Sequence, residues 1–157
     1  MNSDETQIRI GRQGRYRHRA FTIVGRLQLQ DEDASSWHEW YLLFDEGLPG
    51  WLSDGDDTYA VTFETEIAEL DTLPAFESLG LDQKLKLNRR YYDVSDLYMA
   101  FYAGADGDLP FDAEPGTEIP VADLAGPGKS CATIDYSQAS PIVFIGENVD
   151  LEALRLA

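Results

Sequence analysis

Alternation of apolar and polar residues with a period of two is the feature that most restricts the fold of this chain. In the stretch FTIVGRLQL, the odd positions hold the apolar residues Phe21, Ile23, Leu27 and Leu29, and the even positions include Thr, Arg and Gln. Because successive side chains of a β-strand point to opposite faces, this pattern predicts a half-buried strand. Gly25 interrupts the alternation and predicts a β-bulge or a close approach of another backbone segment.

Similar alternating segments recur along the chain, so we predict an all-β fold. Residues 8–64 are typical of an antiparallel meander, and residues 65–80 lose the alternation and form a linker or a short helical turn. A loosely similar order of strands and turns returns in residues 79–149, and VDLEALRLA predicts a short C-terminal helix with Asp150 as its N-cap. The expected architecture is two barrel-like pseudo-repeats, 8–70 and 79–157, packed together as one unit.

The stretch WHEWYLLFDEGLPGWL contains all three tryptophans of the chain and predicts a central β-hairpin. One face of its first strand carries Trp40, Leu42 and Phe44, and the other carries Trp37, Glu39, Tyr41 and Leu43. Apolar side chains on both faces indicate a strand that is covered on both sides. The glycines and the proline of DEGLPG predict the tight connection to the second strand.

The candidate binding residues are Trp37, Glu39, Tyr41 and Trp51, all from this hairpin. An exposed platform of aromatic rings with a carboxylate would bind sugars, cationic groups or peptide strands. In the alternative interpretation, the tryptophans fill the core or the junction between the pseudo-repeats, as large aromatic side chains usually do. The pattern alone leaves both interpretations open.

The charge of the chain is strongly acidic and unevenly distributed. The formal net charge is -17, and residues 31–80 contain 14 acidic residues and no Lys or Arg. Such a field repels nucleic acid and anionic lipid, so we expect no nucleic-acid partner. The acidity either serves solubility alone or attracts a cationic partner, which would be a basic protein, a polyamine or a divalent metal.

No arrangement of residues in the sequence predicts catalysis, a cofactor or a metal site. His38 and Glu39 are adjacent in a strand and therefore point to opposite faces, G-x-S-x-G is absent, and GPGKS lies between strands rather than before a helix. The Asp-rich turns lack the order of a calcium loop, and there is no CxxC pair for zinc. These turns contain Asp54, Asp56 and Asp57 in one case and Asp106, Asp108 and Asp112 in the other.

A cytoplasmic location without membrane insertion is the expected setting. The N-terminal stretch MNSDETQIRIG lacks the apolar segment of a secretory signal, and no apolar run approaches the roughly 18 residues of a membrane span. The single cysteine, Cys131, lies in the alternating segment SCATIDY and is expected to be an inert strand thiol.

Seven segments, taken in order, resemble DUF4178, a bacterial family of unknown function. They are GRYRHRAFTIVGRLQLQ, WHEWYLLFDEGLPGWL, YAVTFE, GDLPF, VADL, ATIDYS and IGENVDLEAL, and W-x-E-W-x-L-L-F…G-W-L is the most specific part. Many members of that family carry a zinc ribbon of two CxxC pairs, which this sequence lacks. Genes for membrane-associated stress proteins and polyamine-enzyme-like proteins often lie near those of the family, and this implies an accessory role. The resemblance supplies no catalytic residues, and its shared W-x-E-W residues correspond here to Trp37, Glu39 and Trp40.

The sequence therefore favours a non-enzymatic interaction module that binds a protein partner through the Trp37–Trp51 hairpin or an exposed sheet edge. A partner with a basic surface would suit the acidic segment. The alternative function is the binding of a small cationic metabolite or a sugar in an aromatic and acidic cleft.

Overall fold

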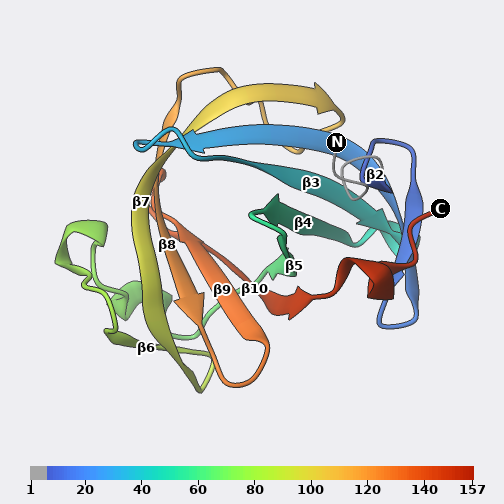
Figure 1. The fold of residues 1–157 in the computed structure, drawn as a ribbon. Helices are drawn as coiled ribbons and strands as arrows, with labels where there is room; N and C mark the ends of the chain where they lie inside the picture. The colour runs from blue at the N-terminus through green and yellow to red at the C-terminus, as the bar shows by residue number, and fades with distance from the viewer. Residues whose placement is uncertain (1–6) are drawn as a thin grey trace.

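The computed structural model describes residues 7–157, which form one continuous antiparallel sheet (Figure 1). The first half of the chain supplies β1 (Gln13–Tyr16), β2 (Arg19–Asp31), β3 (Ser36–Phe44), β4 (Pro49–Gly55) and β5 (Thr58–Glu64). The second half supplies β6 (Lys84–Leu87), β7 (Arg90–Gly107), β8 (Glu118–Ala125), β9 (Ser130–Asp135) and β10 (Ile142–Val149). Four short 3-10 turns complete the regular structure: η1 (Asp45–Gly47), η2 (Leu70–Thr72), η3 (Phe76–Ser78) and η4 (Leu151–Leu154).

Eight of the ten strands close into a ring. The strand order is β1-β2-β3-β4-β5-β10-β9-β8-β7-β6, and β2 also pairs with β7, so that β1 and β6 lie outside the closed circuit. Each half of the chain is a meander, and two seams join the halves: Val61 of β5 pairs with Glu147 of β10, and Leu27 of β2 pairs with Ala105 of β7. The ring is uneven, because the long strands β2 and β7 bend away from each other at their N-terminal ends (Figure 1).

The predicted bulge in β2 is present at Gly25, where the register with β3 shifts. A Cβ atom at Gly25 would collide with the carbonyl group of Asp108, so the backbone approach at this point requires glycine. The bulge also turns the odd-numbered residues of β2 to the other face of the sheet, so Phe21 and Ile23 belong to the first core whereas Leu27 and Leu29 face the interior of the ring. Ile23 pairs with Leu42 before the bulge, and Leu27 pairs with Glu39 after it.

Two apolar cores lie on the outer faces of the ring, one for each half of the chain. The first core consists of Ile8, Phe21, Ile23, Trp40, Leu42, Phe44, Leu52, Tyr59, Val61, Leu151 and Leu154. The second core consists of Ile67, Leu85, Leu87, Tyr92, Val94, Ala122, Leu124, Ala132, Ile134 and Val143. A smaller cluster at the β2–β7 seam contains Leu27, Leu29, Ala100, Ile119 and Val121. Because the two cores use mainly the outward residues of the ring, most inward residues are left to form a separate interior.

The all-β antiparallel meander is confirmed, and its strands form one uneven ring. The predicted C-terminal helix is only the 3-10 turn η4, and the side chain of Asp150 makes no capping hydrogen bond. A 3-10 turn fits here because it places residues three apart on one side, and Leu151 and Leu154 are both buried in the first core. The division of the chain at 8–70 and 79–157 stays a prediction.

Candidate ligand-binding cavity

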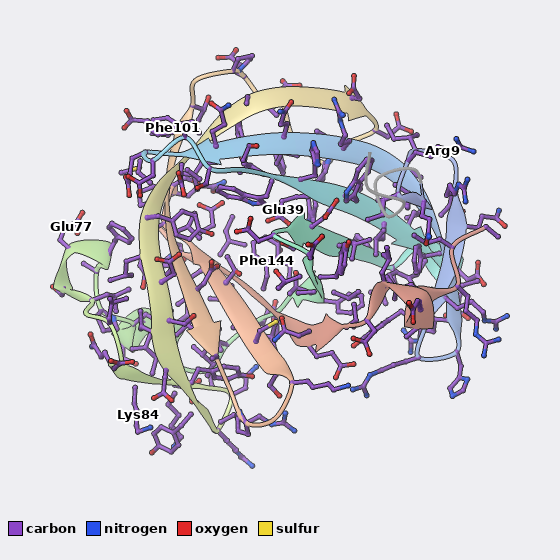
Figure 2. All side chains as sticks on the ribbon, viewed as in Figure 1. Arg9, Glu39, Glu77, Lys84, Phe101 and Phe144 are labelled. Atoms are coloured by element: carbon purple, nitrogen blue, oxygen red, sulfur yellow. The ribbon has the colours of Figure 1, made fainter. Side chains whose placement is uncertain are left out.

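A cavity of about 570 Å³ lies inside the ring, and its lining residues come from all eight ring strands. The alternation of the strands produces it. In β4, Trp51 and Ser53 line the cavity, whereas Leu52 between them belongs to the first core. Figure 2 shows Glu39 and Phe144 in the interior of the ring and Glu77 and Lys84 outside it.

Aromatic rings and carboxyl groups dominate the lining. The aromatic members are Trp37, Trp51, Tyr59, Tyr98, Tyr102, Phe111 and Phe144. The acidic members are Asp31, Glu39, Asp56, Asp96, Asp123 and Asp135. Within the part of the chain that the structure describes, no Lys, Arg or His lines the cavity. The interior therefore combines apolar surface with negative charge that no cationic side chain of the lining balances.

Several of these carboxyl groups have a local structural role. Asp31 accepts hydrogen bonds from the backbone N–H groups of Asp33 and Ser35, at 2.9 and 3.0 Å, in the turn after β2. Asp135 accepts one from the N–H of Ser137, at 2.8 Å, in the turn after β9. Such bonds are typical of aspartate in turns and account for these residues without a ligand.

Glu39, unlike Asp31 and Asp135, does not stabilise a turn. It lies in the middle of β3, where Leu27 and Ser53 are its neighbours on the adjacent strands, and it faces the cavity. Its Oε1 atom accepts a long hydrogen bond of 3.3 Å from Trp37 Nε1. Burial, and then the negative charges of Asp123 and Asp54, raise the pKa of Glu39 to about 8, and the bond from Trp37 offsets only part of this effect.

Asp123 of β8 is the second interior carboxyl group. The Tyr98 hydroxyl donates a hydrogen bond of 2.9 Å to Oδ2, and the Thr133 hydroxyl donates one of 3.0 Å to Oδ1. Burial raises the pKa of Asp123 to about 6, although both hydrogen bonds lower it. At pH 7, Asp123 is therefore mainly ionised and Glu39 mainly protonated.

The aromatic rings form a wall that connects the two halves of the chain. The ring of Trp37 meets the ring of Tyr98 edge to face, with centroids 5.6 Å apart. Phe111 stacks against both Trp51, at 6.1 Å, and Tyr102, at 5.7 Å. Electron-rich ring faces next to carboxyl groups are the surroundings in which organic cations bind well.

Three of the four candidate residues, Trp37, Glu39 and Trp51, line this cavity together. Tyr41 does not line it, but its ring contacts that of Trp51 with a centroid distance of 4.8 Å. Trp37 and Trp51 are half-buried, so they form neither a fully exposed platform nor part of a closed core. Trp40, by contrast, is buried in the first core. A binding role for the four residues stays a prediction.

Sequence reasoning missed the contribution of the second half to the site, above all the hydrogen-bonded group of Tyr98, Asp123 and Thr133. A signal for one of them is present in the segment VADLA, where Asp123 stands between the buried apolar residues Ala122 and Leu124. A carboxyl group in such a position is rarely placed there without a functional or structural reason. The other two carry no distinctive signal in the sequence.

His38 points away from the cavity, on the opposite face of β3 from Glu39. Its ring packs against Trp40 at 5.6 Å, and its Nδ1 atom lies 4.0 Å from Asp54 Oδ2. Cys131 lines the cavity, and burial raises the pKa of its thiol to about 11, so the thiol is protonated at neutral pH. Across residues 7–157, no three His, Cys, Asp or Glu side chains converge in a way that would hold a metal ion.

The comparisons with known proteins place the chain in a family without assigning a function to it. Within the described residues, no helix has the length and apolar character needed to cross a membrane. No match was found among curated proteins or among solved structures. The family model of DUF4178, a domain of unknown function, matches residues 9–151, and the chain therefore belongs to this family.

Proposed function

We propose that this protein is a non-enzymatic binding protein that takes up a small organic cation in the cavity of the ring. The observation that carries the proposal is the composition of the lining, in which six carboxyl groups and seven aromatic rings occur without a described Lys, Arg or His. This composition supports the binding of cations over anions, because an anion would enter a field of its own sign.

The energetics of Glu39 and Asp123 favour a charged ligand over a neutral sugar. Both carboxyl groups have a raised pKa because burial disfavours their ionised forms. A bound cation would compensate this penalty, and the adjacent aromatic faces would add cation–π attraction of about 1–2 kcal/mol. A neutral sugar would supply hydrogen bonds but would leave the charges unbalanced.

The non-enzymatic part of the proposal rests on the protonation of the reactive groups. The pKa of the Cys131 thiol is raised by burial, and the pKa of the Tyr98 hydroxyl is raised by burial and by the charges of Asp123 and Glu39. Both groups therefore stay protonated at neutral pH and are weak nucleophiles.

Isothermal titration calorimetry with n-butylamine, n-butanol and butyrate tests the proposal, because these probes differ mainly in charge. Saturable binding of the amine is expected, with at least tenfold weaker binding of the other two. Glu39→Gln and Asp123→Asn should each weaken amine binding by about tenfold, whereas the control Glu77→Gln removes an exposed carboxyl group outside the ring and should have no effect. Equal binding of the three probes, or amine binding that both cavity variants leave unchanged, would refute the proposal.

Proton release gives a second signature of the same site. Glu39 is mainly protonated at pH 7 and becomes ionised when a cation lies beside it, so amine binding should release about one proton per ligand. Titrations in buffers of different ionisation enthalpy measure this number. A value near zero in the wild-type protein would contradict the assignment of Glu39 to the site.

A protein partner is the second candidate, and a different part of the Trp37–Trp51 hairpin favours it. Leu43 and Leu48 at its turn are 43% and 38% exposed, respectively. Exposed apolar side chains beside an acidic turn would suit a cytoplasmic partner with a basic rim around an apolar patch. If this function holds, Leu48→Ser should abolish capture of a partner from the native cytoplasm at low salt, and Glu39→Gln should not. If Leu48→Ser leaves the capture of the partner unchanged, the hairpin is not the surface that binds it.

A further inference from the structure

The connection between β7 and β8, residues 108–117, crosses the aromatic wall of the cavity as an unpaired strap. Leu109 and Ala113 pack against the cluster at the β2–β7 seam, and Phe111 between them lines the cavity. Leu109 and Ala113 are half-buried, whereas Phe111 is exposed. The strap therefore contributes side chains to the interior without being part of the sheet.

The backbone of the strap is fixed at its two ends. The N–H of Asp108 donates to the carbonyl oxygen of Val24 at 2.8 Å, and the N–H of Gly116 donates to that of Tyr102 at 2.8 Å. Within the described part of the chain, no backbone hydrogen bond is found for residues 109–113. Side-chain contacts alone hold this middle part, so we expect it to open more readily than the paired strands of the sheet.

Phe111 occupies a slot between two rings that come from different halves of the chain. Its ring is inclined by 28° to that of Trp51 and by 19° to that of Tyr102, so it stacks against both. Phe111 is nevertheless 40% exposed, which is unusual for a phenylalanine that belongs to an apolar core. The slot between Trp51 and Tyr102 is thus filled by a side chain that is still accessible to solvent and that has little backbone support.

The slot lies close to the interior carboxyl groups. Ser53 pairs directly with Glu39, and Trp51 is two residues further along the same face of β4, which corresponds to about 7 Å. A ligand whose ring replaced that of Phe111 would reach Glu39 with an amine on a short aliphatic linker. This spacing favours ligands in which a short linker joins the charge to the ring.

We infer that Phe111 is a removable plug, and that the ligand is an arylalkylamine whose flat ring takes the place of the Phe111 ring between Trp51 and Tyr102. This inference rests on the proposed function, since the ammonium group of the ligand would meet the carboxyl groups of the cavity. The strap lifts to admit the ring, and the two aromatic walls select a flat group over a flexible alkyl chain.

Titration calorimetry with 2-phenylethylamine and n-hexylamine tests the inference, because the two amines carry the same charge and differ in the flat ring. The wild-type protein should bind 2-phenylethylamine about tenfold more tightly. Phe111→Ala removes the plug and should raise the affinity for 2-phenylethylamine by about threefold or more, with little change for n-hexylamine. Tyr91→Ala, which truncates an exposed aromatic residue that does not line the cavity, is the matched control and should change neither affinity.

A spectroscopic measurement on the wild-type protein tests the inference without the Phe111→Ala variant. The near-ultraviolet circular dichroism of the ring stack should change on saturation with 2-phenylethylamine and stay unchanged with n-hexylamine. Equal affinities for the two amines, with no effect of Phe111→Ala, would overturn the inference and leave the proposed function intact. If Phe111→Ala weakens the binding of 2-phenylethylamine but not that of n-hexylamine, Phe111 is a fixed part of the cavity wall, and the inference is overturned as well. Failure of both amines to bind would refute the proposed function itself.

Discussion

Glu39 should make the protein less stable as the pH rises, and Glu39→Gln should remove this dependence. Glutamine has nearly the same shape and keeps an oxygen that accepts the hydrogen bond from Trp37 Nε1. It cannot ionise, however, so it carries no penalty for a buried charge. The comparison of the two proteins therefore isolates the cost of ionising one interior carboxyl group.

The magnitude follows from the pKa of Glu39, which moves from 4.5 in the unfolded chain to about 8 in the folded protein. Below pH 4.5 both states hold the proton and no cost arises. As the pH rises from 4.5 to 8, the unfolded chain loses the proton and the folded protein keeps it, so the free energy of unfolding falls by up to about 1.4 kcal/mol per pH unit. Between pH 5 and pH 8 the loss amounts to about 3 kcal/mol.

Urea denaturation at pH 5, 6, 7 and 8, followed by tryptophan fluorescence, measures this effect. The free energy of unfolding of Glu39→Gln should be close to that of the wild type at pH 5 and should exceed it by about 3 kcal/mol at pH 8. The control Glu77→Gln removes an exposed charge and should follow the wild type at every pH. If the difference between wild type and Glu39→Gln does not grow with pH, the view of Glu39 as a buried carboxyl group without compensation is refuted.

Three further predictions address the cavity and the seams. Caesium ions should quench the fluorescence of the half-buried tryptophans more strongly than iodide does, because the lining is acidic; stronger quenching by iodide would contradict that charge. Gly146→Ala should lower the free energy of unfolding by about 3 kcal/mol, since its Cβ would overlap the carbonyl oxygen of Val61 at the β5–β10 seam, whereas Gly80→Ala has open space and should lose little in the same melts. Thr133→Val removes a hydrogen bond to Asp123 and should raise its pKa above about 6, as carbon-13 NMR titration would show; an unchanged value would mean that the bond does not form.

The strands and their faces were predictable because alternation is a local property. The period of two separated the two faces of β3, and Gly25 marked the bulge in β2. The prediction that Phe21, Ile23, Leu27 and Leu29 share one face of β2 was wrong, because the bulge turns Leu27 and Leu29 to the cavity side. The same reasoning placed His38 and Glu39 on opposite faces, which the contacts of the two residues confirm. The prediction of a C-terminal helix was wrong, because two buried leucines three residues apart fit a 3-10 turn as well as an α-helix.

The cavity was not predictable because it depends on which faces meet across the ring. Alternation shows that Glu39 and Asp123 each point to one side of a strand, but it does not show that both point to the same interior. That proximity comes from the β2–β7 and β5–β10 pairings, which join residues far apart in the chain. The position of Phe111 was equally hidden, since its strap makes no ladder from which a register could be predicted.

The two seams also have a consequence for how the ring assembles. Within each meander, most neighbouring strands are joined by short connections, so their pairing costs little chain entropy and should occur early in folding. The seams must wait for the second half of the chain, and ring closure should therefore be the late and slow event. Because the interior exists only after closure, a ligand of the cavity would bind the completed ring and slow its reopening, without accelerating the steps that come before.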